Sequence, residues 1–258
     1  MMKGKLSFIG IGLHDEKDLT IRGMEEAKKS DKVFIELYTS KWHGSLKKLE
    51  KTIDKKIKLL KRKDLEENSK NILELAKTQN VSILVQGDSL VQTTHIALLQ
   101  QARELKIKTK IIHNASIVSV VGETGLHPQK FGPYVTIPFL EKTKGKLPES
   151  VYDVIKMNKS RGLHTLCLLD IIAEEKKYMS PNDGMNLLLN IENERKENVF
   201  TDDTEVVIFA RAGSEKPLII YGKVNELIEK NFGNPPSVLI IPGILHFTEK
   251  DFIEKYKP

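Results

Sequence analysis

Asp88 is an acidic residue at the end of a predicted strand, where its carboxylate could bind a ligand. It lies in LVQGDSLVQTTH (84–95), where a run of apolar residues stops at a Gly-Asp pair and Thr-Thr-His opens the next element. A carboxylate at the end of a buried strand can close a turn, or it can bind a ribose hydroxyl or an ammonium group. The choice between these interpretations depends on the other strand ends.

Glycine and small polar residues mark several other predicted strand ends: GIGL (10–13), HNASIVSVVG (113–122), LLDI (168–171) and ARAG (210–213). In an open parallel sheet, ligands bind beyond the carboxyl ends of the strands. Gly10 and Gly12 would let the backbone approach a ligand closely, although a tight turn explains them equally well. They do not complete the dinucleotide-binding fingerprint GxGxxG, because Asp15 occupies the position of its third glycine. The phosphate-binding motif GxxxxGK[ST] does not occur in the chain either.

The sequence names candidates for a general base but does not choose among them. His95, Asp170 and Asp88 lie at predicted strand ends or helix starts, and His95 could instead organise the Thr-Thr-His turn. The seven histidines contain no HxxxH pair and no His-Cys cluster, so no metal site is predicted. Cys167 lies in an apolar strand and is expected in the core.

Two patterns describe the elements that must position these residues. Strands and helices alternate up to residue 113, which is typical of a parallel α/β sheet with right-handed crossovers. The expected strands there are 5–12, 32–37, 56–60, 81–86 and 109–113, and the helices are 18–30 (with Asp18 or Thr20 as N-cap), 68–80 and 93–107. Later come helices at 148–162 and after Pro181, and strands at 164–171, 205–213, 217–222 and 237–243. The last three favour antiparallel pairing. We predict two α/β domains, 1–113 with a mostly parallel sheet and 114–258 with a mixed sheet.

Composition excludes several classes of protein. The chain has 258 residues, 40% of them hydrophobic and 29% charged, which is ordinary for a globular protein. A single cysteine excludes an intramolecular disulfide and fits a reducing compartment. No apolar run reaches the roughly 20 residues that cross a bilayer, and the start MMKGKLSFIGIG has no signal-peptide cleavage pattern. We expect a cytoplasmic protein that does not associate with membranes.

A basic segment carries much of the net charge of +6: KKLEKTIDKKIKLLKRKDLEE (47–67). It could bind an acidic partner such as RNA or a ribosomal factor. It could also be a solvated helix and edge strand, which is favoured because no aromatic residues interleave with the lysines, as stacking on nucleic acid requires. No direct nucleic-acid binding is expected.

Together the strand-end motifs resemble one family. The matching stretches are FIGIGLHDEKDLT, GDSLVQTTH, IHNASIVSVVGETGL, KFG, GLHTLCLLDI, FTDDTEVVIFARAG and FGNPPSVLIIPGILH. From residue 4 to about residue 250 the chain resembles the diphthine synthases, in their archaeal form, which are tetrapyrrole-methylase-like methyltransferases that use S-adenosyl-L-methionine. The glycine motifs occur across that class, whereas GDxxxxTTH, IHNASI and GLHTLxLLDI are specific to diphthine synthases.

The resemblance implies a fold and a cofactor site. The fold is tetrapyrrole-methylase-like, with the active site in the cleft between the two domains. Carried over by position, the S-adenosyl-L-methionine site consists of Leu13, Asp88, Val91, Ser116, Ile117, Leu169, Ala212 and Ser237. Ser89 stands where relatives usually have proline, and Ser237 replaces a histidine found in some, so a contact at Ser237 is expected through its backbone. No metal is implied.

The resemblance also implies a reaction and partners. Methyl groups would pass to the amine of the 3-amino-3-carboxypropyl group on the modified histidine of translation elongation factor 2, with S-adenosyl-L-homocysteine as product. Three methyl groups are expected, because the short link between LLDI and KYMSPNDG resembles the archaeal form. Phe131 and Tyr134 could line a pocket for the trimethylammonium group. A homodimer is implied as well.

Two other readings remain open. The same fold could methylate a tetrapyrrole precursor or ribosomal RNA, although such relatives would have a fuller glycine pattern in the first loop and would lack TTH and HNASI. Alternatively, the protein could be a non-catalytic module that binds the ribosome or RNA through residues 47–67. That function would leave the strand-end glycines and Asp88 without a role.

Overall fold

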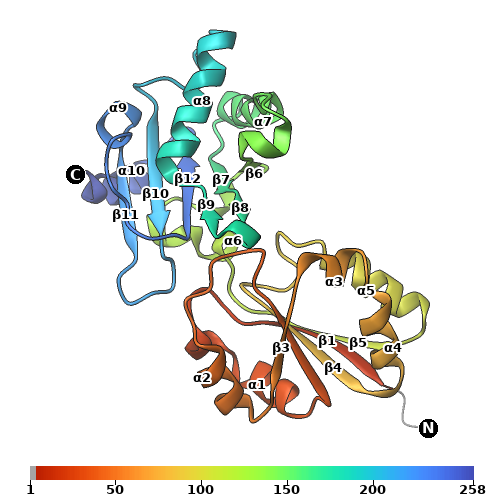
Figure 1. The fold of residues 1–258 in the computed structure, drawn as a ribbon. Helices are drawn as coiled ribbons and strands as arrows, with labels where there is room; N and C mark the ends of the chain where they lie inside the picture. Colours follow the sequence, from red (N-terminus) through yellow and green to blue (C-terminus); the bar gives the residue numbers. More distant parts are fainter. Residues whose placement is uncertain (1–3) are drawn as a thin grey trace. The chain divides into compact units, whose positions relative to one another are not determined.

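The computed structural model describes residues 4–258, which form two compact α/β units (Figure 1). The first unit ends at residue 117 and the second begins at residue 118. The domain boundary predicted from the sequence, residue 113, falls shortly before this division. Among the described residues, no helix is both long and apolar enough to cross a membrane.

The first unit is built on a parallel sheet of five strands: β1 (Lys5–Gly10), β2 (Lys32–Glu36), β3 (Ile57–Leu60), β4 (Asn80–Val85) and β5 (Lys108–Ile112). The strand order is β3-β2-β4-β1-β5, and all neighbours are parallel, as predicted. Gly10 of β1 and Glu36 of β2 both lie opposite Val85 of β4. The carboxyl ends of these three strands therefore share one edge of the sheet.

Helices cover both faces of this sheet: α1 (Ile21–Lys28), α2 (Leu46–Ile53), α3 (Arg62–Glu66), α4 (Lys70–Thr78) and α5 (His95–Glu104). α1 and α2 lie on one face, and α3, α4 and α5 lie on the other (Figure 1). Thr20 is the N-cap of α1, because its hydroxyl accepts from the backbone N–H of Gly23 at 3.0 Å. The basic segment 47–67 spans α2, the edge strand β3 and α3.

The second unit has a mixed sheet: β6 (Val135–Ile137), β7 (Thr165–Leu169), β10 (Glu205–Ala210), β11 (Leu218–Lys223) and β12 (Ser237–Ile241). Its order is β11-β10-β12-β7-β6. Only β6 and β7 are parallel, and the other neighbours are antiparallel, so the predicted mixed sheet is confirmed. A small hairpin, β8 (Ile171–Ile172) with β9 (Lys177–Tyr178), follows β7.

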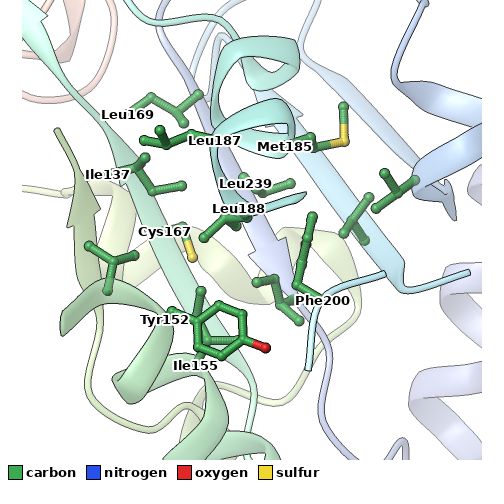
Figure 2. Close-up of a cluster of buried hydrophobic side chains, with 14 of the residues drawn as sticks. Ile137, Tyr152, Ile155, Cys167, Leu169, Met185, Leu187, Leu188, Phe200 and Leu239 are labelled. Carbon is green, nitrogen blue, oxygen red and sulfur yellow. The ribbon is translucent and has the colours of Figure 1, made fainter. Parts of the chain in front are cut away.

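The core of the second unit lies between this sheet and two long helices, α7 (Glu149–Ser160) and α8 (Pro181–Arg195) (Figure 2). Cys167 of β7 is fully buried there, beside Leu188 and Leu239, which confirms its predicted place in the core. Tyr152 is also fully buried and donates its hydroxyl to the Glu192 carboxylate at 2.6 Å. The short helices α6 (Ile117–Val120), α9 (Val224–Leu227) and α10 (Phe247–Ile253) complete the chain.

Candidate active site

The loops that follow β1 and β4 are joined through two glycines. Gly12 donates its backbone N–H to the carbonyl of Gly87 at 3.3 Å, and Gly87 donates to the carbonyl of Gly12 at 2.8 Å. Both have positive φ, +82° and +72°, which favours glycine. A Cβ on Gly10 would lie 2.5 Å from the Gly87 carbonyl oxygen, so a side chain is excluded there too. These glycines allow two loop backbones to meet at the carboxyl edge of the sheet.

This meeting point is also where the strand order reverses. β1 continues through α1 to β2, which lies beyond β4, and β4 continues through α5 to β5, which lies beyond β1. α1 and α5 lie on opposite faces of the sheet (Figure 1). Open α/β sheets bind their ligands at such a switch point, beyond the carboxyl ends of the strands.

Asp88 follows Gly87 and is 5% exposed. Its Oδ1 accepts from the backbone N–H of Leu90 at 3.0 Å. Its Oδ2 pairs with Nδ1 of His113 at 2.8 Å and accepts from the backbone N–H of Asn114 at 3.1 Å. Asp88 therefore both closes its own turn and ties the β4 loop to the β5 loop. A carboxylate has about four lone-pair positions, so one on Oδ1 remains for a ligand.

The other predicted cofactor residues of the first unit lie at the same carboxyl edge. Leu13 follows the Gly12 bridge, and its carbonyl accepts from the Gln86 side chain at 3.2 Å. Val91 lies in the loop after Asp88, whose carbonyl accepts from the Val91 N–H at 3.3 Å. Ser116, which is 7% exposed, follows β5, and Ile117 begins α6. The structure thus brings the loops after β1, β4 and β5 together, and that these residues bind the cofactor stays a prediction.

The three predicted residues of the second unit gather at one edge of the mixed sheet. β7 and β10 both run antiparallel to β12, which lies between them. Ser237 begins β12 and pairs with Ala210, the last residue of β10, while Ala212 follows β10. Leu169 is the last residue of β7. The carboxyl ends of β7 and β10 therefore flank the amino end of β12.

The three candidate bases differ in how many hydrogen-bond partners their side chains have. Asp170 accepts from the backbone N–H of Phe139 at 3.0 Å and of Ile171 at 2.8 Å, and it pairs with Lys142 at 2.6 Å. Asp88 is also largely saturated, as described above. His95 differs from both, because neither of its buried ring nitrogens has a hydrogen-bond partner among the described residues.

Other buried polar atoms near this edge also have no partner in the described part of the chain. They are Gln86 Oε1, Ser89 Oγ and Tyr38 Oη. Gln86 and Ser89 flank the Gly87-Asp88 pair, and unpaired buried atoms of this kind call for a ligand or a water. Sequence reasoning missed Glu36, which is fully buried and lies near His95. A glutamate inside the apolar strand KVFIEL was the signal that could have revealed it.

Phe131 and Tyr134 line a cavity of about 220 Å³ in the second unit. The remaining lining residues are Val118, Val121, Pro128, Gly132 and Leu166. The lining is apolar and aromatic, which suits the methyl groups and the charge of a quaternary ammonium. As for metals, residues 4–258 contain no group of three or more His, Cys, Asp or Glu side chains that could hold an ion.

Comparison with known proteins shows which family this chain belongs to. Residues 5–228 match the family model of the tetrapyrrole (corrin/porphyrin) methylases. The diphthine synthase of Methanocaldococcus jannaschii is 44% identical over 96% of this chain and 97% of its own length, and that of Methanococcus vannielii is 43% identical over the same shares. A crystal structure of a diphthine synthase superposes with a TM-score of 0.89 at 34% identity, covering 98% of this chain and 97% of that one. The chain therefore belongs to the diphthine synthases of the tetrapyrrole methylase family, and it is a methyltransferase.

Proposed function

We propose that this protein transfers methyl groups from S-adenosyl-L-methionine to the amine of the 3-amino-3-carboxypropyl group on the modified histidine of translation elongation factor 2. The observation that carries the proposal is the junction of Gly12, Gly87 and Asp88 at the switch point of a sheet that belongs to a methylase family. The full-length similarity to diphthine synthases supports this substrate over a tetrapyrrole precursor or ribosomal RNA.

The hydrogen-bond acceptors at this edge of the sheet fit the cofactor. S-adenosyl-L-methionine offers ribose hydroxyls and an ammonium as donors, and the edge offers a free lone pair on Asp88 and the unpaired acceptors Gln86 Oε1 and Ser89 Oγ. The glycine backbones of the joined loops allow close approach. Leu13, Val91 and Ile117 would supply apolar and backbone contacts, as adenine sites require.

The residues of the second unit would complete the site. Leu169, Ala212 and Ser237 belong to the other sheet, so the proposal requires the cofactor to contact both units. That the active site lies in an inter-domain cleft stays a prediction. Cytoplasmic location and the absence of a metal requirement stay predictions in the same way.

The bound cofactor supplies an electrophilic methyl group on sulfur. The chain must hold the amine in line with that methyl group and exclude water, because alignment provides much of the acceleration in such a displacement. The amine must also be neutral when it attacks. The apolar cavity beside Phe131 and Tyr134 would accommodate the trimethylammonium product.

The test is direct methylation. Purified elongation factor 2 that carries the unmethylated side chain is incubated with the protein and S-adenosyl-L-methionine, and the factor is analysed by mass spectrometry. A gain of three methyl groups is expected. A fourth methyl group would contradict the assigned product. No gain, together with methylation of a tetrapyrrole precursor or of ribosomal RNA, would establish the alternative.

A further inference from the structure

The first unit has a cavity at the end of its sheet that lies opposite the candidate active site. The cavity has a volume of about 430 Å³ and is formed where β2 and β3 begin, whereas the candidate site lies beyond the carboxyl ends of the strands. Its lining includes four lysines, Lys32, Lys55, Lys56 and Lys58, and a single acidic residue, Asp31. The proposed methyl transfer makes no use of this cavity.

The strand register places two of these lysines beside an aromatic side chain. Phe34 of β2 lies opposite Lys58 of β3, and Lys32 comes two residues before Phe34, so the three side chains share one face of the sheet. Val33, which points the other way, belongs to the core that α1 and α2 cover. Phe34 therefore faces the side of α4, whose Leu75 also lines the cavity. Together they give the cavity an apolar wall next to its lysines.

The lysines of the cavity have few counter-charges. Lys32, Lys55 and Lys58 form no ion pair with another side chain of residues 4–258. Lys56 lies 3.4 Å from Glu50, but the Lys56 side chain is 94% exposed, so solvent screens that ion pair. Like charges that share one face of neighbouring strands repel each other. A bound anion would remove this repulsion.

The acidic residues near the cavity are engaged by the backbone. Asp31 accepts from the N–H of Asn80 at 2.8 Å, and Glu50 accepts from the N–H of Ile57 at 2.9 Å. Asp54 follows α2 as its C-cap and does not line the cavity. The two backbone contacts fix the starts of β4 and β3, and they leave the cavity with an excess of positive charge.

We propose that this cavity binds a small phosphorylated compound of the nucleoside polyphosphate class. Lysine ammonium groups bind phosphates as compact charges, and adjacent phosphates could contact lysines of both strands. The ring system would pack on Phe34 and Leu75. The volume of about 430 Å³ is within the range of small-molecule sites. This inference does not depend on the proposed function, because the cavity and the candidate active site lie at opposite ends of the sheet.

The test is a titration of the isotope-labelled protein with ATP, followed by NMR at low salt. Excess S-adenosyl-L-homocysteine is present throughout, so that ATP does not enter the candidate cofactor site. We expect the largest shifts at the backbone amides of 32–34 and 56–58. Tripolyphosphate, which lacks the ring system, should bind more weakly at the same amides, and adenosine, which lacks the phosphates, should bind most weakly.

Two variants separate the contributions of charge and of the apolar wall. Lys32→Gln with Lys58→Gln should weaken ATP binding by about tenfold, because two ammonium contacts to phosphate are lost. The matched control is Lys47→Gln with Lys51→Gln, which removes the same charge from α2, on the other face of the sheet, and should bind ATP like wild type. Leu75→Ala should weaken the binding of ATP but not that of tripolyphosphate.

Several results would overturn the inference. Shifts spread over lysines throughout the chain, or an equal loss of affinity in the two double variants, would show only general attraction of anions to a basic protein. Adenosine binding as tightly as ATP would exclude recognition of the phosphates. Tripolyphosphate binding as tightly as ATP would exclude the contact between the ring system and the apolar wall.

Discussion

Nδ1 of His113 lies 2.8 Å from Oδ2 of Asp88, and this contact joins the loop after β5 to the loop after β4. The His113 side chain is 71% exposed, whereas that of Asp88 is 7% exposed. The carboxylate is therefore held from the solvent side by an imidazole and from the protein side by two backbone N–H groups. Asp88 therefore closes its own turn and joins two loops, and that it also accepts from a bound cofactor stays a prediction.

Asp88→Asn should weaken cofactor binding with little effect on the fold. The amide oxygen can keep part of the loop contacts, but the charge is lost, which should cost about 1.5–3 kcal/mol of binding free energy. Calorimetry with S-adenosyl-L-methionine measures the change. Asp31→Asn is the control, because Asp31 ties the opposite edge of the sheet by accepting from the Asn80 N–H at 2.8 Å. If Asp88→Asn binds S-adenosyl-L-methionine with wild-type affinity, then Asp88 only closes the turn and does not bind the cofactor.

The basic residues after β3 should accelerate encounter with an acidic protein substrate. Lys61 and Lys63 follow the carboxyl end of β3, on the same edge as the candidate site, whereas Lys55 and Lys56 precede its amino end. Arg62 is unsuitable for this test, because it pairs with Glu66 and lies over Tyr38. Lys61→Gln with Lys63→Gln should lower the methylation rate at low salt only, since screening removes such steering.

The control for that test is Lys55→Gln with Lys56→Gln, which removes the same charge from the other end of β3. Cofactor affinity should be equal in all variants. Equal rates for the two double variants at every salt concentration would show that the segment is a solvated surface.

Stability should fall in acid as the Glu249 carboxylate becomes protonated. Lys130, the backbone N–H groups of His246 and His127, and His164 all favour its charged form. The folded pKa of Glu249 is about 2, below its ordinary 4.5, so its contribution is complete above pH 4.5 and is lost as the pH falls toward 2. It amounts to roughly 3 kcal/mol. Burial also lowers the pKa of His164, so its neutral form adds stability that declines as the pH falls below 6.5.

Urea midpoints from pH 2 to pH 7 for wild type and Glu249→Gln isolate the glutamate's share. The difference between the two proteins should be largest near pH 6 and should nearly vanish at pH 2. Glu197→Gln removes a more exposed carboxylate that pairs with Arg195, and it should change the free energy of unfolding much less, because solvent screens a surface ion pair. A difference that does not depend on pH would contradict the assigned ionisation of Glu249.

A homodimer is predicted from the family, with twice the chain mass of 29.3 kDa. The apolar strands of the second unit do not need another chain to cover them, because Val207, Phe209 and Ile240 are buried within one chain. Exposed apolar side chains of the second unit include Ile244 and Phe247, at 75% and 69%. Light scattering at micromolar concentration checks the mass, and a value near 29 kDa would contradict the prediction.

The sequence predicted most strands and long helices because their apolar periodicity is strong. It missed β6, because three residues after Gly-Pro-Tyr carry too little pattern, and its parallel pairing with β7 is invisible in the sequence. Asp88 could be predicted from its place at a strand end. Its partner His113 could not, because the contact depends on β4, β1 and β5 being neighbours in that order. The pairing of Glu36 with His95 was hidden for the same reason.

The exchange of hydrogen bonds between Gly12 and Gly87 has a consequence for how the site tolerates change. Because each loop backbone is the other's partner, substitutions in the two loops should not be thermodynamically independent, and a double-mutant cycle should give a clear coupling energy. The loops after β1 and β4 should therefore respond to substitution as one structural unit. Insertions should be tolerated better elsewhere, as in the long connection from β2 to β3.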